Sequence, residues 1–220
     1  MLNNPELLSP AGDIVRLKAA IDYGADAVYL AGEEFGMRTA ATNFGEDDLR
    51  AGVIYAHERG AKVFVACNTL PHNDELPRLP AFLEMVADTG VDAFIASDIG
   101  TMELIKKYSP KQELHISVQS GIVNYETARA FYNLGANRIV VARELSIEEI
   151  SEIRAKTSNE LEIEAFVHGA MCVSFSARCL LSSYMTGRDA NRGDCAQSCR
   201  WSYSLIETNR EGQHFDVTET

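Results

Sequence analysis

The chain has 220 residues, a formal net charge of −12 and a hydrophobic content of 46%. This size suits one large core, and we expect a single domain built around it. The acidic balance argues against a surface that coats nucleic acid generally, because phosphate binding needs a basic footprint, although a local basic patch can still serve. No apolar run reaches roughly 18 residues, and the N-terminal segment lacks the pattern of a secretion signal. We therefore expect a cytoplasmic protein with no membrane span.

Short apolar runs alternate with segments of helical period over most of the chain. The runs predict strands at 6–9, 27–31, 62–68, 93–97, 114–118, 138–142 and 162–167. The segments between them predict helices at 14–23, 46–59, 75–89, 99–108, 125–134 and 146–156. Glycines 24, 60, 90 and 135 follow four of these helices, where a left-handed C-terminal cap is expected. Ser146 and Glu149 predict a capping box at the start of the last helix.

Strands that alternate with crossover helices form a parallel sheet, which is either open or closed as a barrel. No Gly-rich dinucleotide fingerprint follows the first predicted strand, where residues 9–13 read Ser-Pro-Ala-Gly-Asp. Seven units in tandem are close to the eight of a TIM barrel. We predict a TIM-barrel-like α/β core over 1–171 that stops one unit short, followed by a Cys-rich segment over 172–201. Residues 202–220 form a polar tail without periodicity, or the start of a further C-terminal part.

The working face of such a barrel lies at the C-terminal ends of its strands. The residues just past the predicted strands are Ser9, Gly12, Glu33, Glu34, Asn68, Asp98, Gln119, Ser120, Arg143, His168 and Gly169. Among these we predict catalytic roles for Asn68, Gln119, Arg143 and His168, with helix capping or a plain loop position as the alternative for each. His168 lies four residues before Cys172, which fits a general acid or base, or a partner of a metal ligand.

Four cysteines, Cys172, Cys179, Cys195 and Cys199, are separated by six, fifteen and three intervening residues. In a reducing compartment such thiols are more typical of metal ligation than of disulfides. Structural zinc usually takes pairs with two to four intervening residues, which only the second pair satisfies. The irregular spacing favours an iron–sulfur cluster, with zinc and unligated thiols as the alternatives. Cys67, at the end of the third predicted strand, is predicted to be an ordinary buried cysteine.

The charge balance reverses around these cysteines, because residues 172–201 contain four arginines and two aspartates. Guanidinium groups bind carboxylates and phosphates, so we predict substrate-binding roles for Arg178, Arg188, Arg192 and Arg200. Neutralisation of the thiolates, or surface ion pairs, is the alternative. Three aromatic residues, Phe175, Tyr184 and Trp201, interleave with the arginines and are suited to stacking on a base or to core packing.

The segment Glu-Ala-Phe-Val-His-Gly-Ala-Met-Cys-Val-Ser-Phe-Ser-Ala-Arg-Cys-Leu-Leu-Ser, residues 164–182, resembles the signature of the U32 peptidase family, also called collagenase-like proteases. The resemblance continues through residues 184–201, 6–13 and 25–30, and so covers nearly the whole chain. Members of this family include oxygen-independent hydroxylases that act on transfer RNA uridine or ribosomal cytidine, and a pair that acts in ubiquinone synthesis. Prephenate is implicated as their hydroxyl source, and several members hold a four-iron cluster on cysteines.

The resemblance implies that Cys172, Cys179 and Cys195 are cluster ligands, with Cys199 or a cysteine further along in longer members as the fourth. It implies a 4Fe-4S-dependent enzyme that hydroxylates an RNA base, foremost the wobble uridine of tRNA, with prephenate or a similar small anion as the hydroxyl source. Two alternatives stay open. One is a peptidase, although the sequence has no Gly-x-Ser-x-Gly or His-Glu-x-x-His motif. The other is a cluster-carrying subunit that works beside a partner of the same family.

Overall fold

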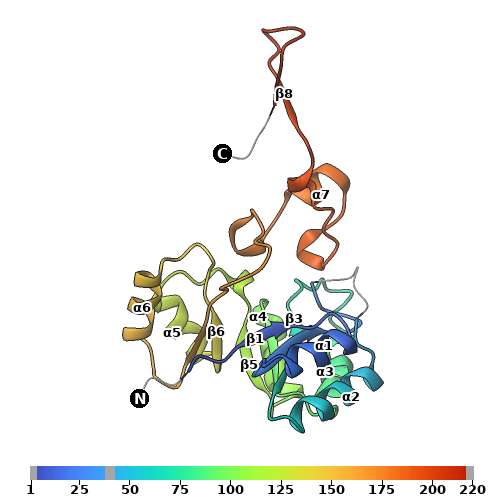
Figure 1. The fold of residues 1–220 in the computed structure, drawn as a ribbon, viewed down its shortest axis with the longest axis vertical. Helices are drawn as coiled ribbons and strands as arrows, with labels where there is room; N and C mark the ends of the chain where they lie inside the picture. The colour runs from blue at the N-terminus through green and yellow to red at the C-terminus, as the bar shows by residue number, and fades with distance from the viewer. Residues whose placement is uncertain (1–3, 38–42, 217–220) are drawn as a thin grey trace.

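A computed structural model describes residues 4–37 and 43–216 and contains a parallel sheet of seven strands with helices on its outer side (Figure 1). The strands are β1 (Leu8–Pro10), β2 (Ala27–Ala31), β3 (Lys62–Cys67), β4 (Ala93–Ala96), β5 (Glu113–Ile116), β6 (Arg138–Val140) and β7 (Glu162–Glu164). The helices that follow the first six strands are α1 (Ile14–Asp22), α2 (Glu46–His57), α3 (Leu79–Asp88), α4 (Ile99–Tyr108), α5 (Tyr125–Asn133) and α6 (Ile147–Ala155).

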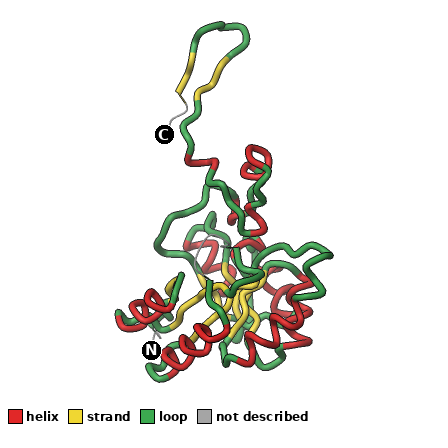
Figure 2. Tube along the Cα trace, turned by 90° about the vertical axis from the view of Figure 1, so that its right-hand side faces the viewer, coloured by secondary structure: helices red, strands yellow, loops and turns green. Residues whose placement is uncertain are grey.

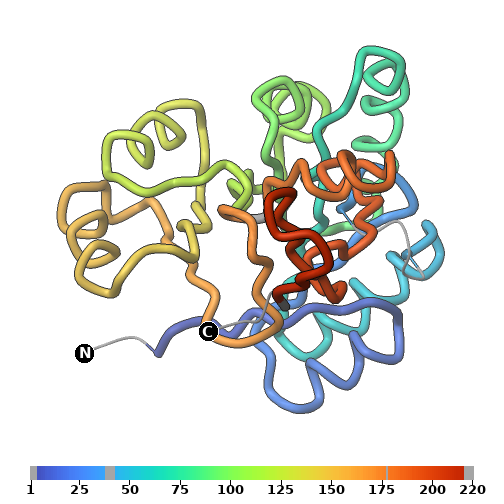
Figure 3. Tube along the Cα trace, turned by 90° about the horizontal axis from the view of Figure 1, so that it is seen from above, coloured from blue at the N-terminus to red at the C-terminus, as the bar shows by residue number. Residues whose placement is uncertain are grey.

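The seven strands pair in chain order, from β1 at one edge to β7 at the other. Within the described residues no ladder joins β7 to β1, so the barrel is open at that side. This confirms the predicted TIM-barrel-like fold that lacks one unit. Figure 3, a view from above, shows the helical coils around the periphery and the C-terminal segment, in orange and red, over the middle. No helix in the described parts of the chain is long and apolar enough to cross a bilayer.

Alternate side chains of each strand serve two different cores, because successive residues point to opposite faces. Val63 and Val65 of β3 face outward into a large cluster with the helices, and both are fully buried. Phe64 faces inward, into a smaller cluster with Ala27, Ala93 and Ile95. Burial on both faces explains why the strands read as continuous apolar runs rather than as alternating patterns.

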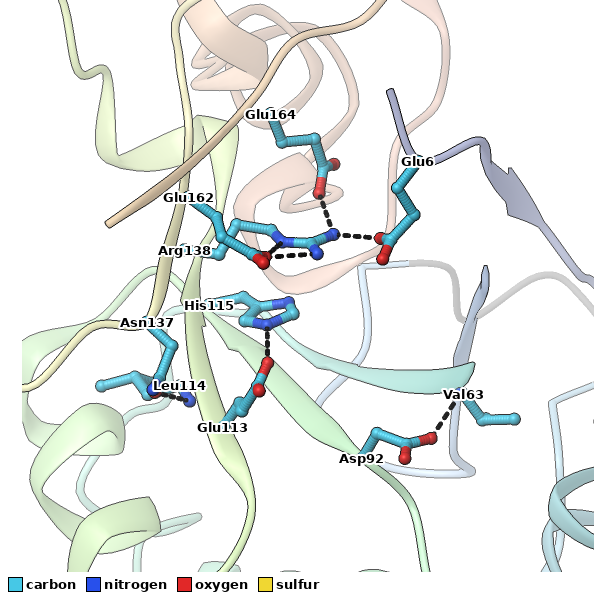
Figure 4. Close-up of polar contacts among 10 residues, drawn as sticks. All are labelled: Glu6, Val63, Asp92, Glu113, Leu114, His115, Asn137, Arg138, Glu162 and Glu164. Atoms are coloured by element: carbon cyan, nitrogen blue, oxygen red, sulfur yellow. Dashed lines mark hydrogen bonds and ion pairs between the residues drawn. The ribbon is translucent and has the colours of Figure 1, made fainter. Parts of the chain in front are cut away.

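Polar side chains complete the barrel interior at the N-terminal ends of the strands (Figure 4). The guanidinium group of Arg138 from β6 donates to Glu162 Oε2 at 2.5 and 2.7 Å and to Glu6 Oε1 at 2.7 Å, with Glu164 Oε2 at 3.4 Å. Glu6 precedes β1 and the other two carboxylates belong to β7. Arg138 therefore ties the two unpaired edges of the sheet together.

His115 of β5 lies in the same interior layer and is fully buried. Its ring meets the ring of Phe64 edge-on, with the ring centroids 4.6 Å apart, and its Nε2 lies 3.1 Å from Glu113 Oε2. Burial lowers the pKa of His115, which opposes its protonation.

Several predicted boundaries differ from the structure. The helix predicted at 75–89 begins at Leu79, because residues 75–78 form turns before Pro80, which occupies a first-turn position of α3. Most predicted strands extend one to three residues too far at their C-terminal ends, where the chain turns toward the next helix. The four glycines predicted as helix caps all have positive φ, and the capping box at Ser146 is present.

The C-terminal region forms structure that the sequence did not predict. Residues 207–220 have no periodic pattern, yet β8 (Ser204–Ile206) and β9 (His214–Asp216) pair as an antiparallel hairpin, with residues 217–220 outside the described residues. Hydrogen bonds from Arg210 N to Glu207 O and from Gln213 N to Arg210 O close its turn. The hairpin projects away from the barrel (Figures 1 and 2). Since neither of its faces packs on the core, no alternation of apolar and polar residues was needed to form it.

Candidate functional site

The Cys-rich segment crosses the C-terminal ends of the strands and is attached there at two places. At the exit of β6, Arg143 Nη2 donates to Ser174 O at 2.9 Å. The neighbouring carboxylate of Glu144 accepts hydrogen bonds from the backbone and the hydroxyl of Ser176, both at 2.9 Å. Phe175 packs on Gly121, where a Cβ would lie 3.3 Å from the ring. Arg143, predicted to be catalytic, therefore holds the segment in place in this structure.

The second attachment lies at the loop after β3. Leu70 N donates to Asn191 O at 3.3 Å, and Arg192 forms an ion pair with Glu75 at 2.8 Å. The side chain of Asn191 accepts from Cys179 N at 3.1 Å and donates to Cys179 O at 2.9 Å. Asn191 thus connects one of the predicted metal ligands to the barrel, although the sequence analysis did not single it out.

All four predicted metal ligands line one cavity of about 170 Å³, together with Met37, Ser174, Leu181, Ser182, Ala190 and Ser198. Cys172, Cys195 and Cys199 are exposed and Cys179 is half-buried. All four are free thiols, as is the buried Cys67. The fold therefore brings together cysteines that are up to 27 residues apart in the sequence (199 minus 172).

The four thiols do not converge on one point. Within the described residues, no three His, Cys, Asp or Glu side chains converge closely enough to hold a single metal ion. Around an iron–sulfur cluster each cysteine binds a different iron, so the ligands stand further apart than they do around one zinc. Four thiols at one cavity are a donor set that both a structural zinc site and an iron–sulfur cluster use.

The sulfur atoms also receive hydrogen bonds. Burial alone would raise the pKa of Cys179, but hydrogen bonds from the Ser174 hydroxyl and from two backbone amides at the start of α7 (Leu181–Thr186) bring that pKa below its ordinary value. Cys195 Sγ accepts from Gln197 N at 3.3 Å. Such contacts stabilise thiolates, the form of cysteine that binds metals.

A second cavity of about 80 Å³ lies at the barrel mouth, at the exits of β1, β2 and β3. Its lining consists of Pro10, Ala11, Gly12, Tyr29, Leu30, Ala31, Met37, Asn43, Ala66 and Asn68. Asn68 Oδ1 accepts from Met37 N at 3.2 Å, and Gln119 Nε2 donates to Met37 Sδ at 3.3 Å. Two residues predicted to be catalytic, Asn68 and Gln119, thus meet at one methionine that the sequence analysis missed.

A signal for Met37 was present in the sequence, because 32–45 is a long connection between a predicted strand and a predicted helix. Connections longer than about 12 residues at this end of a barrel are often functional. The fourth predicted catalytic residue, His168, lies elsewhere. Its side chain is exposed, lines neither cavity and forms no hydrogen bond within the described residues. Its role stays a prediction.

The four predicted substrate-binding arginines divide into two pairs. Arg188 pairs with Asp194 at 2.7 Å, and Arg192 pairs with Glu75 at 2.8 Å. Arg178 and Arg200 are exposed and have no carboxylate partner among the residues that the structure describes. Arg178 adjoins Cys179 and Arg200 adjoins Cys199, so these two cations remain available beside the cysteine cavity.

Comparison with known proteins gives one family and several relatives. The model of peptidase family U32 matches residues 12–219. The chain is 42% identical to tRNA hydroxylation protein P1 of Bacillus subtilis, over 93% of this chain and 48% of that protein. It is 45% identical to the 23S rRNA 5-hydroxycytidine C2501 synthase of Escherichia coli, over 91% of this chain and 30% of that protein. A collagenase of Porphyromonas gingivalis is 31% identical, over 98% of this chain and 54% of that protein.

The chain therefore spans about half the length, or less, of these relatives. Among solved structures, a U32 peptidase superposes with a TM-score of 0.62 at 22% identity, covering 74% of this chain and 68% of that one. At this identity the likeness concerns the fold, and it agrees with the barrel described above.

Proposed function

The chain belongs to peptidase family U32, and from this premise we propose that it binds a 4Fe-4S cluster and takes part in the hydroxylation of an RNA base. The observation that carries the proposal is the cavity lined by Cys172, Cys179, Cys195 and Cys199 at the working face of the barrel. Relatives at 42% and 45% identity are named for hydroxylation of tRNA and of 23S rRNA. The finer assignment, to the wobble uridine of tRNA in the cytoplasm, is part of the proposal.

Each group at this face has a part in the proposal. The cysteine thiolates would hold the cluster, whose chemistry is the transfer of single electrons. Asn191 fixes the backbone of Cys179, and Arg143 and Glu144 fix the segment around Ser174. These attachments hold the ligands on the barrel while leaving their sulfur atoms facing the cavity.

The RNA backbone would meet Arg178 and Arg200, the cations without carboxylate partners. Tyr184 and Trp201 are exposed at 86% and 47% and offer faces on which bases can stack. A small anion such as prephenate, proposed as the hydroxyl source, needs a cationic partner, and Arg178 and Arg200 are predicted binding residues with no described carboxylate partner. We therefore assign the anion to the arginine side of the cysteine cavity.

Iron and sulfide analysis after anaerobic purification tests the cluster. The expected result is a brown protein with about four irons per chain, and Cys179→Ser is expected to lose most of this iron. Cys67→Ser is the matched control, because Cys67 is buried in β3 and lines neither cavity. A protein that stays colourless and iron-free after reconstitution would refute the proposed cofactor.

Mass spectrometry of RNA nucleosides tests the substrate. A strain that lacks the gene is expected to lose 5-hydroxyuridine derivatives from its tRNA, and the gene on a plasmid is expected to restore them. Unchanged tRNA together with a missing hydroxylated cytidine in ribosomal RNA would shift the assignment to ribosomal RNA. Unchanged modification of both RNAs would refute the proposed reaction.

A peptidase is the second candidate, because one relative is named a collagenase. A peptidase needs a nucleophile with a positioned base, or a metal with an open coordination position. Gelatin cleavage by the purified protein, compared with a mock purification, tests this candidate. Activity that survives Cys172→Ser and Cys195→Ser would favour it. A cluster-carrying subunit is the remaining alternative, and it predicts RNA hydroxylation only in the presence of a second chain.

A further inference from the structure

Met37 lines both cavities at the working face of the barrel. On one side of it is the mouth cavity of about 80 Å³, and on the other is the cysteine cavity of about 170 Å³. The side chain of this one methionine therefore stands between the exits of the first three strands and the proposed cluster ligands. A substrate in the mouth cavity is separated from the cysteines by a thioether.

Two carboxamides hold Met37, and neither uses its full hydrogen-bonding capacity in doing so. Gln119 is 3% exposed, and among the described residues its Nε2 donates only to the Met37 sulfur, which is a weak acceptor. Its Oε1 is buried with no hydrogen-bond partner. Leaving a buried acceptor unpaired destabilises the folded protein. A buried amide oxygen without a hydrogen-bond partner indicates that a ligand group pairs with it.

The character of the lining restricts what that ligand is. Among the described residues, the polar side chains here are neutral amides: Asn43 and Asn68 line the mouth cavity, and Gln119 lies behind Met37. Carboxamides donate and accept side by side, which complements the edge of a nucleobase. Flipped and single-stranded bases are recognised by such hydrogen bonds to their edges.

The size of the mouth cavity requires Met37 to move. An apolar cavity of about 150 Å³ holds one benzene molecule, and a pyrimidine has the same six-membered ring with added polar groups. The mouth cavity has about 80 Å³, roughly half of that volume. Methionine is unbranched and has three rotatable bonds, so it can change rotamer where a branched side chain cannot. With its side chain moved aside, the mouth and cysteine cavities join.

We infer that Asn68 and Gln119 bind the edge of a pyrimidine base of the RNA, and that Met37 occupies the place of this base until the base displaces it. This inference deepens the proposed function, since it rests on an RNA base being the substrate. Displacement of Met37 removes the partition, so the bound base then faces the cysteine cavity. Asn68 and Gln119 are in this view specificity-determining residues.

Titration of the full chain with uridine and cytidine tests the inference. The titration needs neither a bound cluster nor catalytic turnover, and ribose serves as the control probe that lacks a base. Met37→Ala is expected to bind the nucleosides several-fold more tightly than the native protein, because no side chain has to be displaced. Met37→Leu, of similar size, is expected to bind like the native protein or more weakly. Gln119→Met is expected to weaken binding about tenfold, in line with the value of a paired base edge. Gln213→Met, in the exposed hairpin, is the matched control and is expected to change nothing.

The native protein supplies a measurement that no folding defect can confound. The methyl NMR signal of Met37 is expected to shift when uridine is added and to stay in place when ribose is added. Nucleosides that bind no better than ribose, or a Gln119→Met variant that binds them as the native protein does, would overturn the inference. Its failure is separable from that of the proposed function. Hydroxylated nucleosides lost from the deletion strain without nucleoside binding here would refute only the role of this pocket, and the reverse result would refute only the reaction.

Discussion

The two ends of the barrel treat buried polar groups in opposite ways. At the N-terminal end, Arg138 is 5% exposed and donates to carboxylates from both edges of the open sheet. At the C-terminal end, Gln119 Oε1 is buried without a partner, and two cavities separate the side chains. Arg138 is thus fully engaged by the fold, whereas Gln119 keeps one buried acceptor unpaired.

Backbone conformation follows the same division. The non-glycine residues with positive φ in the described chain are Phe35, Ser176 and Gln197, and all three lie in the loops at the C-terminal end. A left-handed conformation costs an L-amino acid roughly 1–2 kcal/mol, so this end stores strain that packing elsewhere offsets. His115 Nδ1, which is buried and unpaired, is an exception at the opposite end. The N-terminal end of the barrel therefore contributes more to the stability of the fold than the C-terminal end does. Substitutions at each end test this difference.

The largest effect is expected from Arg138→Met. Removal of the guanidinium group leaves the partly buried carboxylates of Glu6 and Glu164, which are 29% and 19% exposed, without their cation. Breaking a buried ion pair by removing one partner typically costs 3–5 kcal/mol, and we expect about that loss in the free energy of unfolding, measured with denaturant. Arg129→Met, in an exposed pair with Glu126, is the matched control and should cost less than about 1 kcal/mol. Equal losses in the two variants would contradict the comparison.

A smaller effect is expected from Asn191→Ala at the opposite end. The variant loses both hydrogen bonds to the backbone of Cys179, at about 1–3 kcal/mol for buried groups left unpaired. We expect local opening rather than global unfolding, seen as faster alkylation of Cys179 in the metal-free protein with little change in the denaturation midpoint. Asn209→Ala, in the turn of the hairpin, controls for loss of an asparagine. A midpoint that falls as far as that of Arg138→Met would show that the two ends are not separate.

The pH dependence of stability is expected to arise from His115. Its pKa in the folded protein is below the ordinary 6.5, because burial opposes its charge. As the pH falls through 6.5, His115 binds a proton in the unfolded chain but not in the folded chain. The free energy of unfolding therefore decreases, by at most about 1.4 kcal/mol per pH unit. His115→Gln is expected to flatten this dependence between about pH 7 and 5.5, measured as the denaturation midpoint. If the denaturation midpoint of His115→Gln depends on pH as that of the native protein does, other groups cause the pH dependence.

Below this window Glu164 acts in the opposite direction. Burial raises its pKa, so the folded protein takes up that proton at a higher pH than the unfolded chain does. Protonation of Glu164 thus favours the folded state as the pH approaches the ordinary carboxyl range. The measurement on His115→Gln is therefore best made above that range.

The smallest effect is expected from Arg178→Ala or Arg200→Ala, which should leave stability unchanged and weaken RNA binding modestly. Each lost phosphate contact reduces the slope of binding against salt concentration by about one. Arg188→Ala, whose side chain is paired with Asp194, is the matched control and should change that slope less. Filter binding of tRNA across a salt series measures the difference. Identical slopes for all three variants would show that Arg178 and Arg200 make no special contribution to phosphate binding.

Much of the fold was predictable from the sequence because its rules are local. Apolar runs, helical periods and glycine caps repeat in seven units, and their order requires only that each strand pair with the next one along the chain. Boundaries were less predictable. Residues 75–78 have a helical pattern but form turns, because the proline at position 80 favours the first turn of a helix. The hairpin of β8 and β9 packs on nothing that would have imposed a pattern.

The candidate site was predictable in its residue types but not in its arrangement. Spacing and resemblance singled out the four cysteines, and the exits of the strands singled out Asn68 and Gln119. Nothing local connects Met37 to Gln119, which is 82 residues further along, or Asn191 to the loop after β3. Such contacts depend on how closed the barrel is and on how the Cys-rich segment lies across it.

The sequence by itself therefore determined the α/β repeat, the open barrel and the cysteines as candidate ligands, because hydrophobic period and turn chemistry act over a few residues. Only the tertiary structure decided that all four thiols share one cavity, that Arg188 and Arg192 are paired while Arg178 and Arg200 are not, and that a methionine separates the two cavities. Those outcomes depend on side chains that meet from distant strands, and no local pattern specifies which partner each one finds.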